Sequence, residues 1–275
     1  MNILITPAGG NLGTEVSKQL SVKHQVFGGV RSPSTTNQLA GVSYVAFDYD
    51  DPASYKNALE SIEAVVLQAP PLDAGAFERL VPFLDAVKAA NINRVVFVSA
   101  YGVDHNDEAP LRKIELKLIK EDFNYTIVRP NFFMENFTSG FAAGPLEHDG
   151  IVLASSGEGK LAFVSIKDIA AVITISLSVA GHEGKAYNLT GPEALSHADI
   201  AQTISNKLGK DIPYVSISGD ELKAGAMKNG LPESSADYLV MLYDLAKQGL
   251  MSAATKDVEN VLGRQPLRFT EVFTG

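Results

Sequence analysis

Short apolar runs alternate with amphipathic stretches through the first half of the chain. The runs lie at Asn2–Thr6, His24–Val30, Val42–Phe47, Ala64–Leu67, Arg94–Ser99 and Tyr125–Arg129. Each has the length and content of a strand buried on both faces of a sheet. Between them, apolar positions recur at helical spacing from Phe77 to Val87 and in Pro110–Asp122, and Asn11–Leu20 has helical composition. This alternation predicts an α/β fold with a Rossmann-type, doubly wound parallel sheet.

The pattern loosens from about Ala143 into shorter strands and helices. We therefore expect a domain at 1–142, to which residues 163–190 return, and a smaller C-terminal α/β substrate lobe at 143–275. Two helices in the later part begin with a serine followed three residues on by an aspartate, Ser165 with Asp168 and Ser196 with Asp199. This spacing predicts a capping box at each helix start.

The stretch from Met1 to Gly13 passes from a strand through a small-residue turn into a helix. Such a turn directs backbone N–H groups and the positive end of the helix dipole at one point, which suits a pyrophosphate. The three glycine positions of the dinucleotide signature hold Pro7, Gly10 and Gly13, and Pro7 removes one donor. We expect the cofactor to contact the turn residues, which are Thr6, Ala8, Gly9, Gly10, Asn11, Leu12 and Gly13.

The end of the second predicted strand indicates which dinucleotide is bound. No Asp or Glu stands between Val16 and Gly41, and Arg31 follows the strand. An acid there would bind the ribose hydroxyl of NAD, whereas an arginine pairs with the 2′-phosphate of NADP. We therefore expect NADP(H) in preference to NAD(H), the alternative being a solvated surface arginine. Asp48, after the third strand, either accepts from the adenine amino group or caps the helix at Pro52.

Composition narrows the function classes. The net charge of −9 argues against a nucleic-acid partner and an anionic membrane surface. The absence of cysteine removes thiolate metal sites and thiol nucleophiles, and the histidines lack metal-ligand spacing, so we expect no metal. We expect a cytoplasmic monomer or homodimer whose partner is a small molecule.

Several motifs together resemble one family. They are Thr6-Pro7-Ala8-Gly9-Gly10-Asn11-Leu12-Gly13, Val30-Arg31-Ser32-Pro33, Val98-Ser99-Ala100-Tyr101-Gly102, the run from Tyr125 to Asn136, the run from Phe163 to Ala170, Ala186-Tyr187-Asn188-Leu189-Thr190-Gly191 and the run from Asp257 to Arg264. The chain resembles the NmrA-like, atypical short-chain dehydrogenases/reductases, and within them the branch of NAD(P)H:quinone oxidoreductase type 2 and triphenylmethane reductase.

The resemblance implies an NADPH-binding sheet and a smaller substrate lobe. It places the pyrophosphate on the glycine turn and the 2′-phosphate on Arg31. It further implies cofactor contacts by Gln68, Ala69 and Pro70 on the ribose side, by Ser99, Ala100 and Tyr101 near the nicotinamide, and by the backbone of Pro130, Asn131, Phe132 and Phe133. For the substrate we expect Phe133, Asn136 and Phe137, with core packing as the alternative for the aromatic residues.

One departure decides the expected chemistry. The Tyr-x-x-x-Lys dyad of ordinary short-chain dehydrogenases is missing: counting back in fours from Glu115, the slots hold Leu111 and Asp107. Without that proton donor we expect hydride transfer to a quinone-like or other conjugated acceptor, whose product takes its proton from water. Tyr101 and Lys113 are the candidate local donors, although a lysine there also fits a solvated helix face. The alternative function is a non-catalytic NADP(H)-binding redox sensor.

Overall fold

The computed structural model describes residues 1–139 and 152–274. The described chain forms two compact units. Unit 1 comprises Met1–Pro71, Gly75–Arg129 and Ile169–Asn188, and unit 2 comprises Leu72–Ala74, Pro130–Asp168 and Leu189–Gly275. The domain boundary predicted at residue 142 lies outside the described residues.

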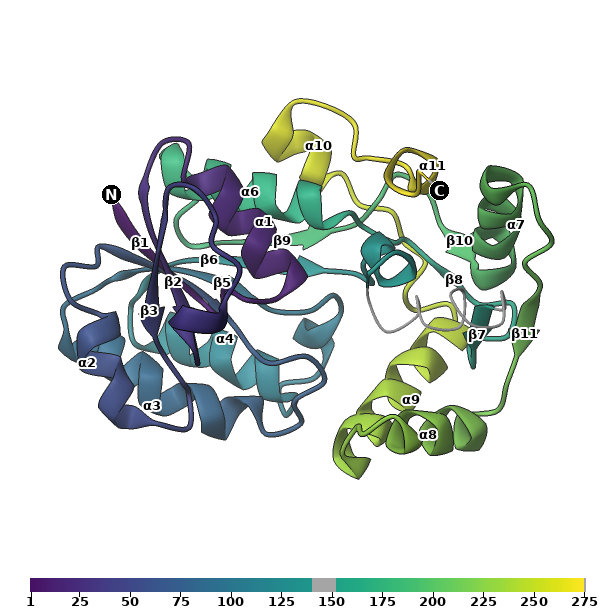
Figure 1. Cartoon of the computed structure of the whole chain (residues 1–275), viewed down its shortest axis with the longest axis horizontal. Helices are drawn as coiled ribbons and strands as arrows, with labels where there is room; N and C mark the ends of the chain where they lie inside the picture. The colour runs from purple at the N-terminus through teal and green to yellow at the C-terminus, as the bar shows by residue number, and fades with distance from the viewer. Residues whose placement is uncertain (140–151, 275) are drawn as a thin grey trace. The chain divides into compact units, whose positions relative to one another are not determined.

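Unit 1 is built on a seven-stranded sheet in the order β3-β2-β1-β4-β5-β6-β9 (Figure 1). The strand pairs from β3 to β6 are all parallel. The strands are β1 (Asn2–Thr6), β2 (Gln25–Val30), β3 (Val42–Ala46), β4 (Ala64–Gln68), β5 (Arg94–Val98), β6 (Asn124–Pro130) and β9 (Lys185–Leu189). The predicted doubly wound parallel sheet is confirmed, and the six predicted strands are all present within one or two residues of the expected ends.

Helices cover both faces of this sheet (Figure 1). On one face lie α1 (Asn11–Leu20) and α6 (Ile166–Ser178), and on the other α2 (Tyr55–Ala58), α3 (Ala76–Ala89) and α4 (Pro110–Lys120). The second face holds a core cluster in which the side chains of α3 and α4 meet those of the central strands. Three short 3-10 helices complete the unit: η1 (Pro33–Thr35), η2 (Pro52–Ser54) and η3 (Val103–His105).

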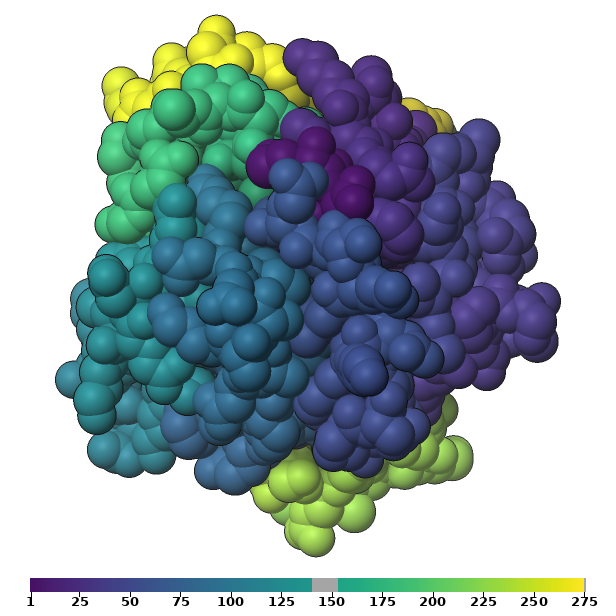
Figure 2. Space-filling model, turned by 90° about the vertical axis from the view of Figure 1, so that its left-hand side faces the viewer, coloured from purple at the N-terminus to yellow at the C-terminus, as the bar shows by residue number. Residues whose placement is uncertain are grey.

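The parallel strands bring their ends to two edges of the sheet. The start of the chain lies at the surface, as the darkest segment of Figure 2 shows, and Met1 is 43% exposed. The residues that sequence analysis selected follow the opposite, carboxyl ends. Crevices for ligands in open α/β sheets form at those ends, so the sheet itself positions the candidate site.

Unit 2 has two small sheets and several helices. β7 (Val152–Ala154) pairs in parallel with β11 (Tyr214–Ser216), and β8 (Lys160–Leu161) pairs antiparallel with β10 (Leu195–Ser196). The helical segments are η4 (Met134–Phe137), α7 (His197–Leu208), α8 (Gly219–Lys228), α9 (Glu233–Lys247), α10 (Asp257–Leu262) and α11 (Phe269–Val272). A core of Ala154, Leu239 and Tyr243 joins β7 to α9.

Among residues 1–139 and 152–274, no helix combines the length and the apolar character that crossing a membrane requires.

Candidate functional site

The turn between β1 and α1 brings a helix N-terminus to the end of a buried strand. Gly10 caps α1, whose first turn contains no acidic residue. The Ala8 N–H donates to the Gly29 carbonyl of β2 over 2.9 Å, which fixes the turn to the neighbouring strand. Because the amides and the dipole at such a helix end attract negative charge, this geometry suits a pyrophosphate.

Two glycines of the turn have different physical roles. A Cβ added to Gly13 would lie 2.4 Å from the Pro7 carbonyl oxygen, so only glycine lets α1 pack this closely on the turn. A Cβ added to Gly10 would meet no described atom within 4 Å. Gly9 and Gly10 are both exposed. The turn is therefore tight at Gly13 and open at Gly10, as a cradle for a bulky anion requires.

The ends of β1 and β4 are joined by side-chain hydrogen bonds. Gln68 Nε2 donates to the Pro7 carbonyl over 2.6 Å, and the Thr6–Pro7 peptide bond is cis. The Tyr49 hydroxyl lies 2.9 Å from both Thr6 Oγ1 and the Gln68 carbonyl oxygen. Burial raises the pKa of Tyr49 well above its usual range, so the hydroxyl stays protonated. Sequence analysis missed Tyr49, whose only signal is one aromatic residue among the acids of Asp48–Asp51.

The segments that follow β2 and β3 are expected to bind the adenosine end of the cofactor, and they contain a cation and several local turns. Arg31 follows β2 and is exposed. Asp48 accepts from the Asp50 N–H at 3.0 Å, and Asp51 caps η2 by accepting from the Ala53 N–H at 3.1 Å. The capping alternative thus accounts for Asp51 with Pro52, while Asp48 also closes a turn of its own. Adenine binding by Asp48 and phosphate binding by Arg31 stay predictions.

The end of β5 holds a buried polar atom that lacks a partner. Ser99 is 5% exposed, and its Oγ makes no hydrogen bond within the described part of the chain. Its backbone N–H donates to the Val128 carbonyl of β6 over 2.8 Å. A buried hydroxyl with no partner is costly unless a ligand satisfies it. Ser99 therefore fits the predicted contact to the nicotinamide end of a dinucleotide.

Neither predicted proton donor has an environment that favours proton release at neutral pH. Burial, together with the charge of Asp104, raises the pKa of the Tyr101 phenol. The hydrogen bond from Lys113 to Glu108 raises the pKa of the Lys113 ammonium, and the two groups lie 2.8 Å apart at the surface. In ordinary dyads the lysine lowers the tyrosine pKa instead. The roles of Tyr101 and Lys113 stay predictions.

The segment from Pro130 to Phe133 belongs to unit 2, where most of its backbone is already paired. The Asn131 N–H donates to the Leu189 carbonyl over 2.9 Å, and the Phe132 N–H donates to Asn131 Oδ1 over 2.8 Å. Phe132 O accepts from the Val164 N–H at 2.9 Å. The Phe133 N–H has no hydrogen-bond partner in the described ranges. Of the amides in this segment, Phe133 thus has the one available to a ligand.

The predicted substrate residues differ in exposure. Phe137 is 3% exposed and packs against Phe163 and Phe269, with ring centroids 5.6 Å apart in both pairs, as the core-packing alternative describes. Phe133 and Asn136 are partly exposed. Phe132, also partly exposed, lies with its ring 5.5 Å from that of Tyr243. Substrate contact by Phe133, Asn136 and Phe137 stays a prediction.

A buried histidine of unit 2 was not singled out from the sequence. His197 is 1% exposed, its Nδ1 lies 2.8 Å from Ser156 Oγ, and aromatic rings surround it. Burial lowers the pKa of His197 to about 4. The ring is neutral at pH 7 and acts as part of the core.

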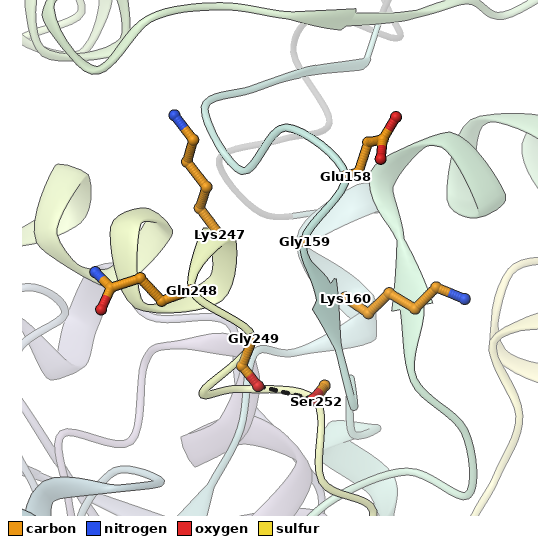
Figure 3. A pocket seen from close by; sticks show the side chains of 7 residues that line it. All are labelled: Glu158, Gly159, Lys160, Lys247, Gln248, Gly249 and Ser252. Atoms are coloured by element: carbon orange, nitrogen blue, oxygen red, sulfur yellow. Dashed lines mark hydrogen bonds between the residues drawn. The ribbon is translucent and has the colours of Figure 1, made fainter.

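A pocket of about 410 Å³ lies in unit 2 between the β7–β8 connection and the end of α9. Figure 3 shows its lining, in which Lys247, Lys160 and Glu158 point in different directions. Polar groups that converge on one point mark a ligand site, and these do not converge. A search of the described residues also finds no group of three or more His, Asp or Glu side chains that could hold a metal ion.

Comparison with known proteins agrees with the geometry of unit 1. A model of the NAD(P)H-binding family matches residues 8–178. The chain is 30% identical to the prestalk A differentiation protein A of Dictyostelium discoideum, over 98% of this chain and 91% of that protein. It is also 30% identical to the NAD(P)H azoreductase of Xenophilus azovorans, over 98% of this chain and 96% of that protein.

Solved structures share the same architecture. The NADPH-dependent quinone oxidoreductase QOR2 from Escherichia coli, in complex with NADPH, superposes with a TM-score of 0.83 at 26% identity, over 99% of this chain and 98% of that one. The triphenylmethane reductase of Citrobacter sp., in complex with NADP(H), has a TM-score of 0.82 at 23% identity, over 98% of each chain. At that identity the second likeness shows the fold alone.

Proposed function

The chain belongs to the NAD(P)H-binding family, and from this premise we propose that it is an NADPH-dependent reductase of quinone-like or other conjugated small molecules. The resemblance predicted from the sequence, to the NmrA-like reductases and their quinone reductase branch, is confirmed by the family match and by the likeness to the quinone oxidoreductase QOR2. The relatives' names include quinone oxidoreductase and azoreductase, which supports a flat, electron-poor acceptor for this chain.

The single observation that carries the proposal is the turn between β1 and α1. It has the space at Gly10, the close packing at Gly13 and the acid-free helix start that a dinucleotide pyrophosphate needs. Ser99 Oγ would hold the nicotinamide end, because it lacks a partner in the described structure. Arg31 would pair with the 2′-phosphate. NADPH bound there supplies a hydride, which is one proton with two electrons.

The protein's own part in the reaction is to bind and orient. The dyad slots hold Leu111 and Asp107, and the Asp107 carboxylate is bound by Arg112. Neither side chain can protonate a carbonyl oxygen. A quinone needs less help, since hydride addition gives a stabilised anion that takes its proton from water, and positioning supplies much of the rate.

Steady-state oxidation of NADPH with a panel of quinones and azo dyes tests the proposal. We expect turnover with at least one acceptor, followed as loss of the reduced-nicotinamide absorbance, and weaker activity with NADH. An aldehyde and a ketone serve as controls, because they need the missing proton donor. If the protein reduced the aldehyde or the ketone but reduced none of the quinones, the proposed acceptor class would be contradicted.

A second candidate function is an NADP(H)-binding sensor without turnover. The absence of the Tyr-x-x-x-Lys dyad favours it, because the chain lacks the proton donor of ordinary short-chain dehydrogenases. Calorimetry separates the two functions. Micromolar NADPH binding without oxidation across the acceptor panel would establish the sensor, whereas turnover with a quinone would exclude it.

A further inference from the structure

A cluster of charged side chains lies inside unit 1, between α4 and β6. Glu115 on α4 is fully buried, and Arg129 on β6 is 7% exposed. Arg129 Nε donates to Glu115 Oε1 over 2.9 Å, and Arg129 Nη2 donates to Glu115 Oε2 over 2.8 Å. A paired guanidinium and carboxylate of this kind have fixed geometry. The pair therefore forms a rigid link between α4 and β6.

The third donor of the guanidinium reaches the segment that follows β5. Arg129 Nη1 donates to Asp104 Oδ2 over 2.6 Å. Asp104 lies in η3, five residues after Ser99 in the sequence. Between them Gly102 has a φ of +79°, which favours glycine, so the chain turns sharply there. Arg129 thus holds the far end of a turn whose near end is Ser99.

The near end is held by the same strand. Ser99 N–H donates to the Val128 carbonyl over 2.8 Å, and Val128 immediately precedes Arg129 on β6. Two consecutive residues of β6 therefore fix both ends of the Ser99–Asp104 segment, one through its backbone and one through its side chain. Ser99 and Tyr101, the residues expected at the nicotinamide, lie between these two points.

Within the described residues, Arg112 at the outer side of the cluster makes no direct hydrogen bond to this turn. Arg112 Nη1 donates to Glu115 Oε2 over 2.9 Å, and Arg112 Nε donates to Asp107 Oδ1 over 3.0 Å. Asp107 is mostly exposed, with 71% of its side chain accessible. Asp104 and Asp107 thus each accept from one arginine of the cluster, but only the Asp104 contact bridges to Arg129. This difference provides a matched control.

We propose that Arg129 is a positioning residue for hydride transfer: held by Glu115, it fixes Asp104 and so places Ser99 and Tyr101 against the nicotinamide. The inference rests on the proposed function. Arg129 touches neither cofactor nor acceptor in this role, and acts through the turn.

The test compares Asp104→Ala with Asp107→Ala in the full chain. Asp104→Ala leaves the Arg129–Glu115 pair intact and removes its link to the turn, together with the carboxylate charge that acts on Tyr101. We expect kcat for a quinone to fall about 10- to 100-fold, because small misplacement of reacting groups costs that much, while the Kd for NADPH and the thermal midpoint change little. Asp107→Ala should keep wild-type kcat. Asp104→Asn, whose amide oxygen still accepts from Arg129, should restore most of the lost rate.

Hydrogen exchange provides a readout that does not depend on turnover. In Asp104→Ala the amides of residues 99–105 should exchange faster than in wild type and in Asp107→Ala, because the turn has lost one anchor. Selective loss of protection without any quinone turnover in wild type would show that Asp104 anchors the turn to Arg129 and would refute the proposed reductase, and with it the role in hydride transfer. Unchanged exchange in Asp104→Ala would overturn the positioning role, and so would an equal loss of kcat in Asp104→Ala and Asp104→Asn.

Discussion

The side-chain amide of Gln68 donates to the Pro7 carbonyl over 2.6 Å and so links the end of β4 to the turn after β1. Pro7 stands in the place of the first glycine of the dinucleotide signature. Proline at this position removes an N–H, yet its carbonyl gives the turn a lateral anchor. The departure from the signature is thus accompanied by a contact that keeps the turn in place.

Replacement of Gln68 should weaken cofactor binding more than stability. Gln68→Leu retains the size of the side chain but removes the donor to Pro7. A hydrogen bond of this kind is worth about 0.5–1.5 kcal/mol, which corresponds to roughly 2- to 13-fold in Kd. Calorimetric titration with NADPH measures the change, and thermal unfolding provides the control. An unchanged Kd would show that the anchor does not shape the binding turn.

Two glycine substitutions should separate the packing of α1 on the turn from the space that the turn leaves for the cofactor. Gly13→Ala places a methyl group 2.4 Å from the Pro7 carbonyl oxygen, so we expect a loss of about 1–3 kcal/mol in unfolding free energy. Gly10→Ala meets no described atom within 4 Å and has an ordinary backbone φ of −85°. It should fold like wild type and bind NADPH less well, since the methyl group occupies space expected for the pyrophosphate. Denaturant unfolding and calorimetry on both variants check this pair.

Arg31→Ala tests the preference for NADPH. Charge-assisted hydrogen bonds from a guanidinium to a phosphate are worth about 1.5–3 kcal/mol, so the Kd for NADPH should rise about tenfold or more. Binding of NADH, which lacks the 2′-phosphate, should be unaffected and is the internal control. An equal loss for both cofactors would indicate a general effect on the turn after β2 instead of phosphate recognition.

The stability of unit 2 should fall in mild acid because of His197. Burial lowers the pKa of His197 from 6.5 to about 4, so the unfolded chain binds the proton more tightly than the folded chain. The contribution of neutral His197 to the free energy of unfolding is fully present above pH 6.5 and is lost as the pH falls towards 4. The loss amounts to about 3 kcal/mol. Thermal midpoints measured across this range should decline.

A double variant provides the control for that decline. His197→Phe with Ser156→Ala removes the titrating ring and the hydroxyl that pairs with it. The slope of stability against pH between 6.5 and 4 should then be smaller than in wild type. An identical slope would assign the acid sensitivity to other groups.

Sequence patterns predicted side-chain hydrogen bonds correctly where the two bonded residues are close together in the sequence. The capping box of Ser196 with Asp199 is present, because its two hydrogen bonds depend only on one helical turn. The same spacing at Ser165 with Asp168 gave a wrong prediction for the carboxylate. Asp168 binds Arg264 Nη2 at 2.6 Å and the Leu267 N–H at 2.7 Å, while Ser165 Oγ donates to Glu135. Partners a hundred residues away override a local motif, and a single sequence does not reveal them.

The sheet and the glycine turn were predictable for a related reason. The buried strands and the turn residues carry their signal in consecutive positions, such as the apolar run Asn2–Thr6 before Gly9 and Gly10. The Arg129–Glu115 pair and the Tyr49 hydroxyl have no such signal, because each contact depends on how two separate elements pack. The chemistry of the site depends on these longer-range contacts, which is why its details required the structure.

The fully buried carboxylate of Asp168 has a bearing on how the polypeptide matures on the ribosome. Its cation and its amide donor lie 96 and 99 positions further along. A nascent chain that has not yet extended past Leu267 contains a negative charge destined for the interior with nothing to neutralise it, and closing that interior early would be strongly unfavourable. Completion of the interior of unit 2 therefore has to wait until Arg264 and Leu267 have been synthesised.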